Sequence, residues 1–258
     1  MKIHLKLLLK SVKSVAQNRE NNTRFHLGTR GYIYKKTEDL DLHDKITHKY
    51  FTFSNLFVVK DEKIEENKAY TLYISSPDSR FISMILYNTY LNEIVNLGEY
   101  SFVLEKIIYE KGFSIKDFSI FQTATMINLT KNLSKSYKAL IYGKDVDFIK
   151  HLNNNLLSKY NEYNKTKINI DLFKNCKIRA IGKKSVCLKI NKETGDFNII
   201  GNILEFKFGK LNKTQRDVLE FGLQCGFGER TSYGLGFLFP VKRSDPDIIS
   251  EFNDLMGA

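Results

Sequence analysis

The 258-residue chain has little proline and little cysteine, and it lacks any long hydrophobic run. Only 3 residues are Pro and 42% are hydrophobic, so the chain is neither disordered nor collagen-like and can bury a substantial core. Its 3 cysteines have no Cys-x-x-Cys spacing, which predicts neither a disulfide framework nor a zinc site and indicates a reducing compartment. No stretch reaches membrane-spanning length, and lysines interrupt residues 1–10, so we expect a cytoplasmic protein that does not bind a membrane.

Negative charge is also scarce, because 40 Lys and Arg face 29 Asp and Glu, which gives a net charge of +11 and a pI near 9.3. The excess lies in two segments, +7 over residues 1–60 and +10 over 150–216, whereas 61–149 carries −2 and 217–258 carries −4. A drift in composition would spread the charge evenly, so this distribution predicts a surface that follows a polyanion. Since 32 of the 40 cations are Lys, attraction to phosphates is favoured over reading of base edges.

The first half of the chain predicts a β-α-β-β-α-β order. Apolar residues alternate over residues 3–9, as in a half-exposed strand, and Ser76-Pro77 is typical of a helix start. A polar turn is expected at residues 17–23, and Gly98 is expected to end the second helix. The expected elements are strand 3–9, a weakly supported helix 25–36, strands 50–59 and 69–75 as a hairpin, helix 77–97 and strand 101–109.

The second half repeats this order and ends in a tail helix expected within residues 244–258. Asn212 and Gln215 form a capping-box pattern that opens a helix ending at Gly226. The expected elements are strand 119–129, helix 144–163, strands 176–190 and 197–208, helix 213–225 and strand 235–241. We therefore predict an α+β protein of two tandem ferredoxin-like (βαββαβ) domains, residues 1–112 and 113–258.

A glycine-rich segment, residues 226–236 (GFGERTSYGLG), lies near the C-terminus. Its glycines leave a helix and open a strand, the reverse of the dinucleotide-binding motif, and they do not match the phosphate-loop spacing. Backbone N–H groups, two hydroxyls and one guanidinium here suit a phosphate or a sugar. The alternative is a glycine-permitted helix end followed by a bulged edge strand. The candidate binding residues are Gly226, Gly228, Arg230, Thr231, Ser232, Gly234 and Gly236.

This segment resembles the C-terminal glycine-rich loop of the repeat-associated RNA-binding (RAMP) superfamily, in particular the CRISPR endoribonucleases that cut precursor CRISPR RNA within its repeats. Residues 197–201 (FNIIG) and 42–54 (LHDKITHKYFTFS) are also similar to that family, which shares the tandem ferredoxin-like architecture. The resemblance implies RNA processing in antiviral defence, with CRISPR repeat RNA and subunits of an effector complex as partners. It also implies a catalytic N-terminal domain and a C-terminal domain that binds RNA through the glycine segment; the chain is expected to be a monomer or a homodimer.

Cleavage of RNA without a metal needs a base for the 2′-hydroxyl proton, an acid for the leaving 5′-oxygen and a cation for the charge on phosphorus. Histidine can serve as base or acid near neutral pH. Of the 5 histidines, His4 and His151 are interpreted as surface residues, which leaves His26, His43 and His48. The acidic residues are scattered, so the sequence predicts no metal site and no cofactor.

The resemblance implies that His43 is the general base, that Lys49 stabilises the transition state and that Tyr34 is the acid or an orienting group. The base and acid roles of His43 and Tyr34 can be exchanged, and Tyr34 can equally be a packed aromatic. His48 with Lys45 is the alternative pair. Two other functions stay open: a non-catalytic RNA-binding subunit of an effector complex, and an enzyme acting on a small anionic substrate.

Overall fold

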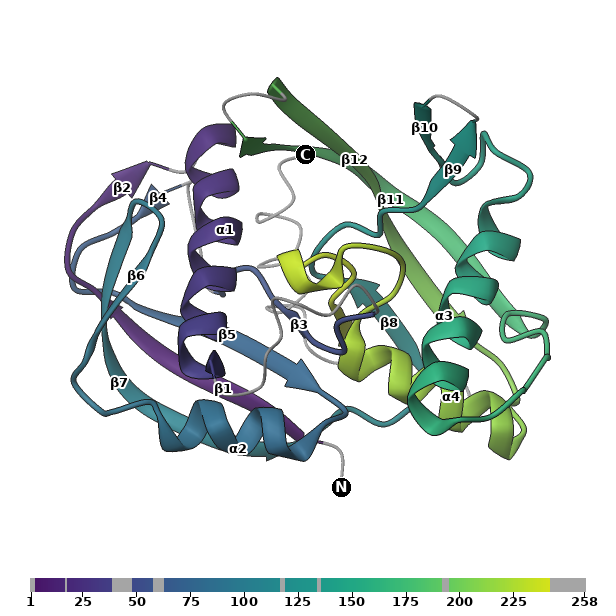
Figure 1. Ribbon diagram of the computed structural model, residues 1–258, viewed down its shortest axis with the longest axis horizontal. Coiled ribbons are helices and arrows are strands. Elements are labelled where there is room, and N and C mark those ends of the chain that lie inside the picture. Colours follow the sequence, from purple (N-terminus) through teal and green to yellow (C-terminus); the bar gives the residue numbers. More distant parts are fainter. Residues whose placement is uncertain are drawn as a thin grey trace.

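The computed structural model describes residues 3–16, 18–38, 48–57, 63–116, 119–133, 136–191 and 195–241. Two antiparallel sheets, one from each half of the chain, lie to either side of a central glycine segment (Figure 1). The elements of the first half are β1 (Ile3–Ser11), β2 (Val15–Ala16), α1 (Arg19–Lys36), β3 (Thr52–Phe53), β4 (Lys63–Ile64), β5 (Ala69–Ser76), α2 (Ser79–Tyr87), β6 (Ile94–Leu97) and β7 (Tyr100–Lys111).

The second half contains the longest strands, β11 and β12, which form an extended hairpin (Figure 1). Its elements are β8 (Ile120–Thr123), β9 (Thr130–Leu133), β10 (Ser136–Ala139), α3 (Phe148–Asn164), β11 (Cys176–Asn191), β12 (Gly195–Phe208), α4 (Lys213–Cys225), a 3₁₀ turn (Thr231–Tyr233) and β13 (Leu238–Pro240). None of the described helices is long and apolar enough to cross a bilayer. Cys176 and Cys225 are free thiols.

Both large sheets have the ferredoxin-like strand order. The first is β3-β5-β1-β7-β6 and the second is β11-β12-β8-β13, so in each the first long strand lies between the third and the last strand of its unit. All of these pairings are antiparallel. The predicted fold class, two tandem β-α-β-β-α-β units, is therefore confirmed; the division at residues 112 and 113 stays a prediction.

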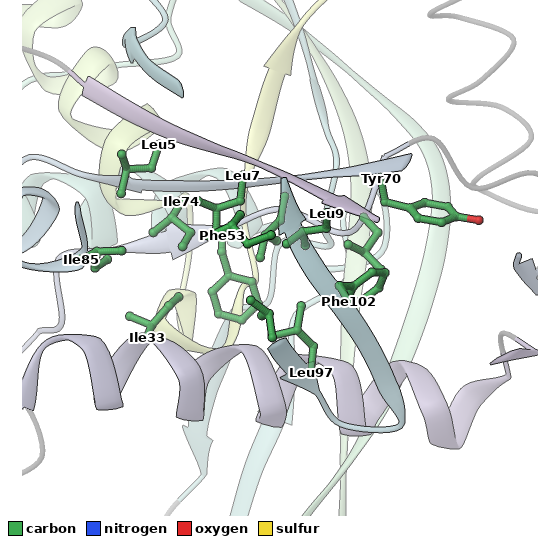
Figure 2. Close-up of a cluster of buried hydrophobic side chains, with 14 of the residues drawn as sticks. Leu5, Leu7, Leu9, Ile33, Phe53, Tyr70, Ile74, Ile85, Leu97 and Phe102 are labelled. Carbon is green, nitrogen blue, oxygen red and sulfur yellow. The ribbon is translucent and has the colours of Figure 1, made fainter. Parts of the chain in front are cut away.

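The first core lies between the sheet and its two helices. Leu5, Leu7 and Leu9 alternate along β1 and are fully buried, as the period-2 pattern predicts. Figure 2 shows these leucines on the same side of the sheet as Ile33 of α1. Burial of each such side chain contributes about 2 kcal/mol. Because Ile33 and Tyr34 belong to the same buried cluster, packing in this core also fixes the side of α1 that carries Tyr34.

Three expectations for the first half are wrong at element boundaries. Helix α1 begins directly after Asn18, whose side chain accepts a hydrogen bond from the Asn21 amide (2.8 Å), so residues 19–23 are helical and not a turn. Helix α2 is capped by Asp78, not Ser76, and ends at Tyr87. Residues 94–97 form β6, which turns at Gly98 into β7, because Val95 and Leu97 are buried by alternation and not by helical spacing.

Other elements are shorter than expected. Within residues 50–57, the described part of the predicted strand 50–59, only β3 pairs with β5, and Phe57 adds an isolated bridge to Thr71. Likewise β8 and β13 cover only parts of the predicted strands 119–129 and 235–241, and the β9–β10 hairpin has no counterpart in the prediction. The capping box of Asn212 and Gln215 is confirmed. The tail helix expected within residues 244–258 lies outside the described residues.

The prediction that His4 lies on the surface is wrong. Its side chain points to the face of the first sheet opposite the helices, but the second half of the chain covers that face: His4 is 1% exposed and its ring lies 4.3 Å from that of Phe113. Nε2 accepts a hydrogen bond from the Phe113 amide (2.9 Å), and burial lowers the pKa of His4 to about 4. His151 is half-buried on α3.

Candidate active site

Helix α1 carries three polar side chains toward the centre of the molecule. His26, Arg30 and Tyr34 are spaced four residues apart, so they share one face of the helix. The helix approaches the β6–β7 turn so closely that a Cβ on Gly28 would overlap the backbone of Gly98. This close packing fixes the position of α1, and with it the row of three side chains.

The glycine segment, residues 226–236, folds back from the end of α4 and reaches toward α1 (Figure 1). Gly234 has a φ of +76°, and a Cβ there would overlap the ring of Phe53 in β3. A Cβ on Gly228 would lie 2.6 Å from the Asn128 carbonyl oxygen. Glycine is thus needed for close approach inside the protein itself, in agreement with the glycine-permitted helix end that the sequence left open.

A buried lysine holds the start of this segment. Lys159 of α3 is 3% exposed, and its ammonium group donates hydrogen bonds to the carbonyl oxygens of Gly226 (3.1 Å) and Gly228. Burial lowers the pKa of Lys159. Buried lysine is uncommon without such partners, so Lys159 ties the glycine segment to the second core.

Tyr233 connects the glycine segment to α1. Its carbonyl oxygen accepts a hydrogen bond from Nδ1 of His26 (2.9 Å), which makes that nitrogen the donor. The guanidinium of Arg30 lies 4.0 Å from the centre of the Tyr233 ring. Nearby, the Thr52 hydroxyl donates to the Leu235 carbonyl oxygen (3.2 Å). The two halves of the chain therefore meet where α1 carries its polar row.

Four side chains, Arg30, Tyr34, Lys49 and Tyr233, form what we call the Tyr34 cluster. The Arg30 guanidinium lies 4.8 Å from the centre of the Tyr34 ring and donates to its hydroxyl (3.1 Å). The Lys49 ammonium lies 5.3 Å from the same ring centre. Tyr34 is 6% exposed and packs edge-on against Phe51, so it is also a packed aromatic. The cluster thus contains two of the three predicted catalytic residues.

The predicted polar contacts of the glycine segment are engaged within the protein. Arg230 donates from Nη1 to the Asn128 side-chain oxygen (2.6 Å) and lies 3.8 Å from the Glu229 carboxylate. Thr231 is 4% exposed and Ser232 is 8% exposed, so neither hydroxyl is on the surface. Their direct contact with phosphate or sugar stays a prediction, and it would require these side chains to move.

The candidate histidines lie in different places. His43, the predicted base, and Lys45 of the alternative pair fall outside the described residues. His48 lies against α3 of the second half, where its Nε2 is 3.8 Å from the Glu162 carboxylate and 3.5 Å from the Ser158 hydroxyl. Burial, followed by the charge of Lys159, lowers the pKa of His48. His26 is 5% exposed and belongs to the α1–Tyr233 contact.

The sequence reasoning missed Arg30, Tyr233 and Lys159. Arg30 had a usable signal, because it lies midway between His26 and Tyr34 at helical spacing. Tyr233 lies within the glycine segment, but only glycines and its polar neighbours were predicted to bind RNA. Lys159 had no signal, since one lysine among 32 is expected on the surface. Within the described residues, His, Cys, Asp and Glu side chains form no group of three that could hold a metal ion.

The fold and the glycine segment define the chain as a tandem ferredoxin-like protein. A solved structure described as CRISPR associated protein Cas6 has a TM-score of 0.69 and 21% identity, with 94% of this chain and 100% of that chain covered. Another, described as a RAMP protein binding different RNA substrates, has a TM-score of 0.70 and 19% identity, with coverage of 93% and 100%. At these identities the likeness establishes the fold.

Sequence comparison establishes the family. Residues 109–239 match the family model for the C-terminal part of CRISPR associated protein Cas6. Two curated proteins of Methanocaldococcus jannaschii, named CRISPR-associated endoribonuclease Cas6 2 and Cas6 1, are each 31% identical, over 223 and 212 residues. The alignments cover 82% of this chain and 90% of the first relative, and 78% and 77% for the second. The chain therefore belongs to the Cas6 family.

Proposed function

We propose that this chain is a metal-independent endoribonuclease that binds CRISPR repeat RNA and cleaves precursor CRISPR RNA within the repeat. The observation that carries the proposal is the Tyr34 cluster, in which a lysine and an arginine approach one tyrosine beside the glycine segment. Relatives at 31% identity carry the name endoribonuclease, which supports the same activity. Repeat RNA is the proposed partner; effector-complex subunits and a monomeric or homodimeric state stay predictions.

In the proposed reaction, His43 removes the proton of the 2′-hydroxyl and that oxygen attacks the adjacent phosphorus. The bond from phosphorus to the 5′-oxygen breaks as that oxygen is protonated, and the proton that His43 has taken up can be returned there. The fragments end in a 2′,3′-cyclic phosphate and a 5′-hydroxyl. Lys49 stabilises the negative charge that builds on the phosphate oxygens. Burial of Tyr34 and its hydrogen bond from Arg30 favour the orienting role for this tyrosine over that of acid.

The glycine segment, residues 226–236, supports this function as an RNA-binding element. Because Thr231 and Ser232 are buried and Arg230 is bound to Asn128, we propose that its contacts with RNA are made by backbone N–H groups. The N–H groups of residues 227, 229, 233, 234 and 236 donate within the protein, so those of other residues in the segment are the candidates. The exposed lysines of residues 150–216, a segment with a net charge of +10, provide the attraction to the RNA backbone.

The test uses repeat RNA in the presence of EDTA, either intact or with a 2′-deoxy nucleotide before the cut. We expect cleavage of the intact RNA, binding without cleavage of the deoxy RNA, and product ends as stated above. His43→Ala should lower the rate at least ~10²-fold, whereas His48→Ala, the matched control, should retain it. Binding of repeat RNA without any cleavage by the wild type would establish the non-catalytic subunit instead, and binding without repeat preference would contradict both.

A further inference from the structure

Arg30 has no acidic partner among the described residues, in contrast to four other arginines of the chain. Arg24, Arg80, Arg179 and Arg230 each form an ion pair with a carboxylate. Arg30 has none in the described part of the chain, although it is half-buried and its Nε is shielded from solvent without a hydrogen-bond acceptor there. A guanidinium keeps its charge at any physiological pH, so this position holds a cation whose hydration is only partly replaced.

Lys49 is also a half-buried cation. It too has no ion-pair partner among the residues that the structure describes. Its ammonium and the Arg30 guanidinium approach the same Tyr34 ring, at 5.3 Å and 4.8 Å from its centre. Two like charges at one ring repel each other unless an anion lies between or beside them. Aromatic faces attract cations, but they do not neutralise charge.

We infer that Arg30 and Lys49 together form a phosphate site, and that Arg30 is a catalytic residue which contacts the phosphate that is cut. This inference rests on the proposed ribonuclease function and adds a second cation to its transition state. Nη2 donates to the Tyr34 hydroxyl, and the guanidinium has further N–H groups for a phosphate oxygen. The Tyr233 ring, 4.0 Å away, holds the guanidinium in place from the glycine segment.

This arrangement explains why an arginine and not a lysine stands at position 30. Only a planar guanidinium can lie against one ring, donate to the hydroxyl of another and still offer N–H groups to an anion. A lysine ammonium at the same place lacks this planar geometry and could not make all three contacts at once. Arg30 therefore links three elements of the site: the glycine segment, Tyr34 and the phosphate.

The test measures single-turnover cleavage with protein in excess over repeat RNA, and binding with the 2′-deoxy RNA. Arg30→Gln should lower the cleavage rate about 100-fold, while the dissociation constant changes less than about 5-fold. Arg30→Lys should fall about 10-fold below wild type, because it keeps the charge without the planar geometry. Arg24→Gln, the matched control, removes an exposed arginine of the same helix that pairs with Glu20 and Glu99, and it should stay within about 2-fold.

A double-mutant cycle tests whether the two cations act on one phosphate. If they do, Arg30→Gln with Lys49→Gln should lose less rate than the product of the single losses. The inference is overturned if Arg30→Gln cleaves within about 3-fold of wild type, or if its rate falls only in step with its binding or thermal midpoint. Should that variant not fold, Arg30→Lys decides, and a rate equal to wild type overturns the inference. Absence of cleavage by the wild type would instead overturn the proposed function and this role with it.

Discussion

His4 should make the folded state sensitive to acid in a way that one substitution removes. The side chain is 1% exposed, and burial lowers its pKa from the ordinary 6.5 to about 4. The folded state therefore excludes a proton that the unfolded chain binds below pH 6.5. The contribution of neutral His4 to the free energy of unfolding is therefore fully present above pH 6.5. It is lost as the pH falls toward 4, because only the unfolded state gains a proton over this range.

The size of the effect follows from the two pKa values. Between pH 7 and pH 5, wild type should lose about 2 kcal/mol of unfolding free energy through His4 alone, rising to about 3 kcal/mol at pH 4. His4→Gln keeps a side-chain oxygen that can accept from the Phe113 amide but does not titrate, so this loss should vanish. Urea unfolding followed by far-UV circular dichroism at pH 7, 6 and 5 measures it.

His4→Phe provides the matched control. It also removes the titrating group, so its stability should be as independent of pH in this range as that of His4→Gln. It leaves the Phe113 N–H without an acceptor, however, and should be less stable than His4→Gln by about 1–3 kcal/mol at every pH. If wild type and His4→Gln lose equal stability between pH 7 and pH 5, the assignment of a neutral, buried His4 is refuted.

Two further predictions concern the glycine segment. Gly234→Ala should destabilise the protein by more than about 2 kcal/mol in thermal unfolding, because its φ is +76° and a Cβ would overlap the Phe53 ring; Gly31→Ala, in an open helical position, should instead stabilise it by about 0.5 kcal/mol, and equal effects would contradict this reading. Lys159→Met should lower stability by about 2 kcal/mol in urea unfolding, since two buried carbonyl groups lose their donor. An unchanged unfolding midpoint would show that Lys159 does not hold the segment.

The periodicity of apolar residues predicted helices and strands well where one face of the element is buried and the other is exposed to solvent. The alternation of Leu5, Leu7 and Leu9 identified β1 because the first core lies on one side of that strand. The same reasoning failed for residues 94–97, where Val95 also fits the helical spacing of Phe81 and Ile85. A four-residue strand contains too few positions to separate the two periods, and only its pairing with β7 decides between them.

Local sequence patterns could not predict the contacts between the two halves of the chain. His4 reads as an outward residue of β1, and it does point away from the first core, but Phe113 and Phe237 of the second half cover that face. For the glycine segment, too, the sequence did not reveal the contact with the other half. Its sequence shows that small residues are required, yet not that Gly234 meets the Phe53 ring of the other half. Of the predicted catalytic residues, Tyr34 and Lys49 lie together, and their catalytic roles stay predictions.

In the proposed function, the cations that bind the RNA backbone and those that act in its cleavage lie in different parts of the protein. Lys165, Lys167, Lys174 and Lys177 are exposed on the second half, where mobile ammonium groups can follow a phosphate backbone and release counterions. Arg30 and Lys49 of the first half are half-buried beside Tyr34, where they are screened less by salt and can act on one phosphate. Affinity should therefore depend steeply on salt, whereas the cleavage rate of bound RNA should depend on it weakly, because the two properties arise from cations in different surroundings.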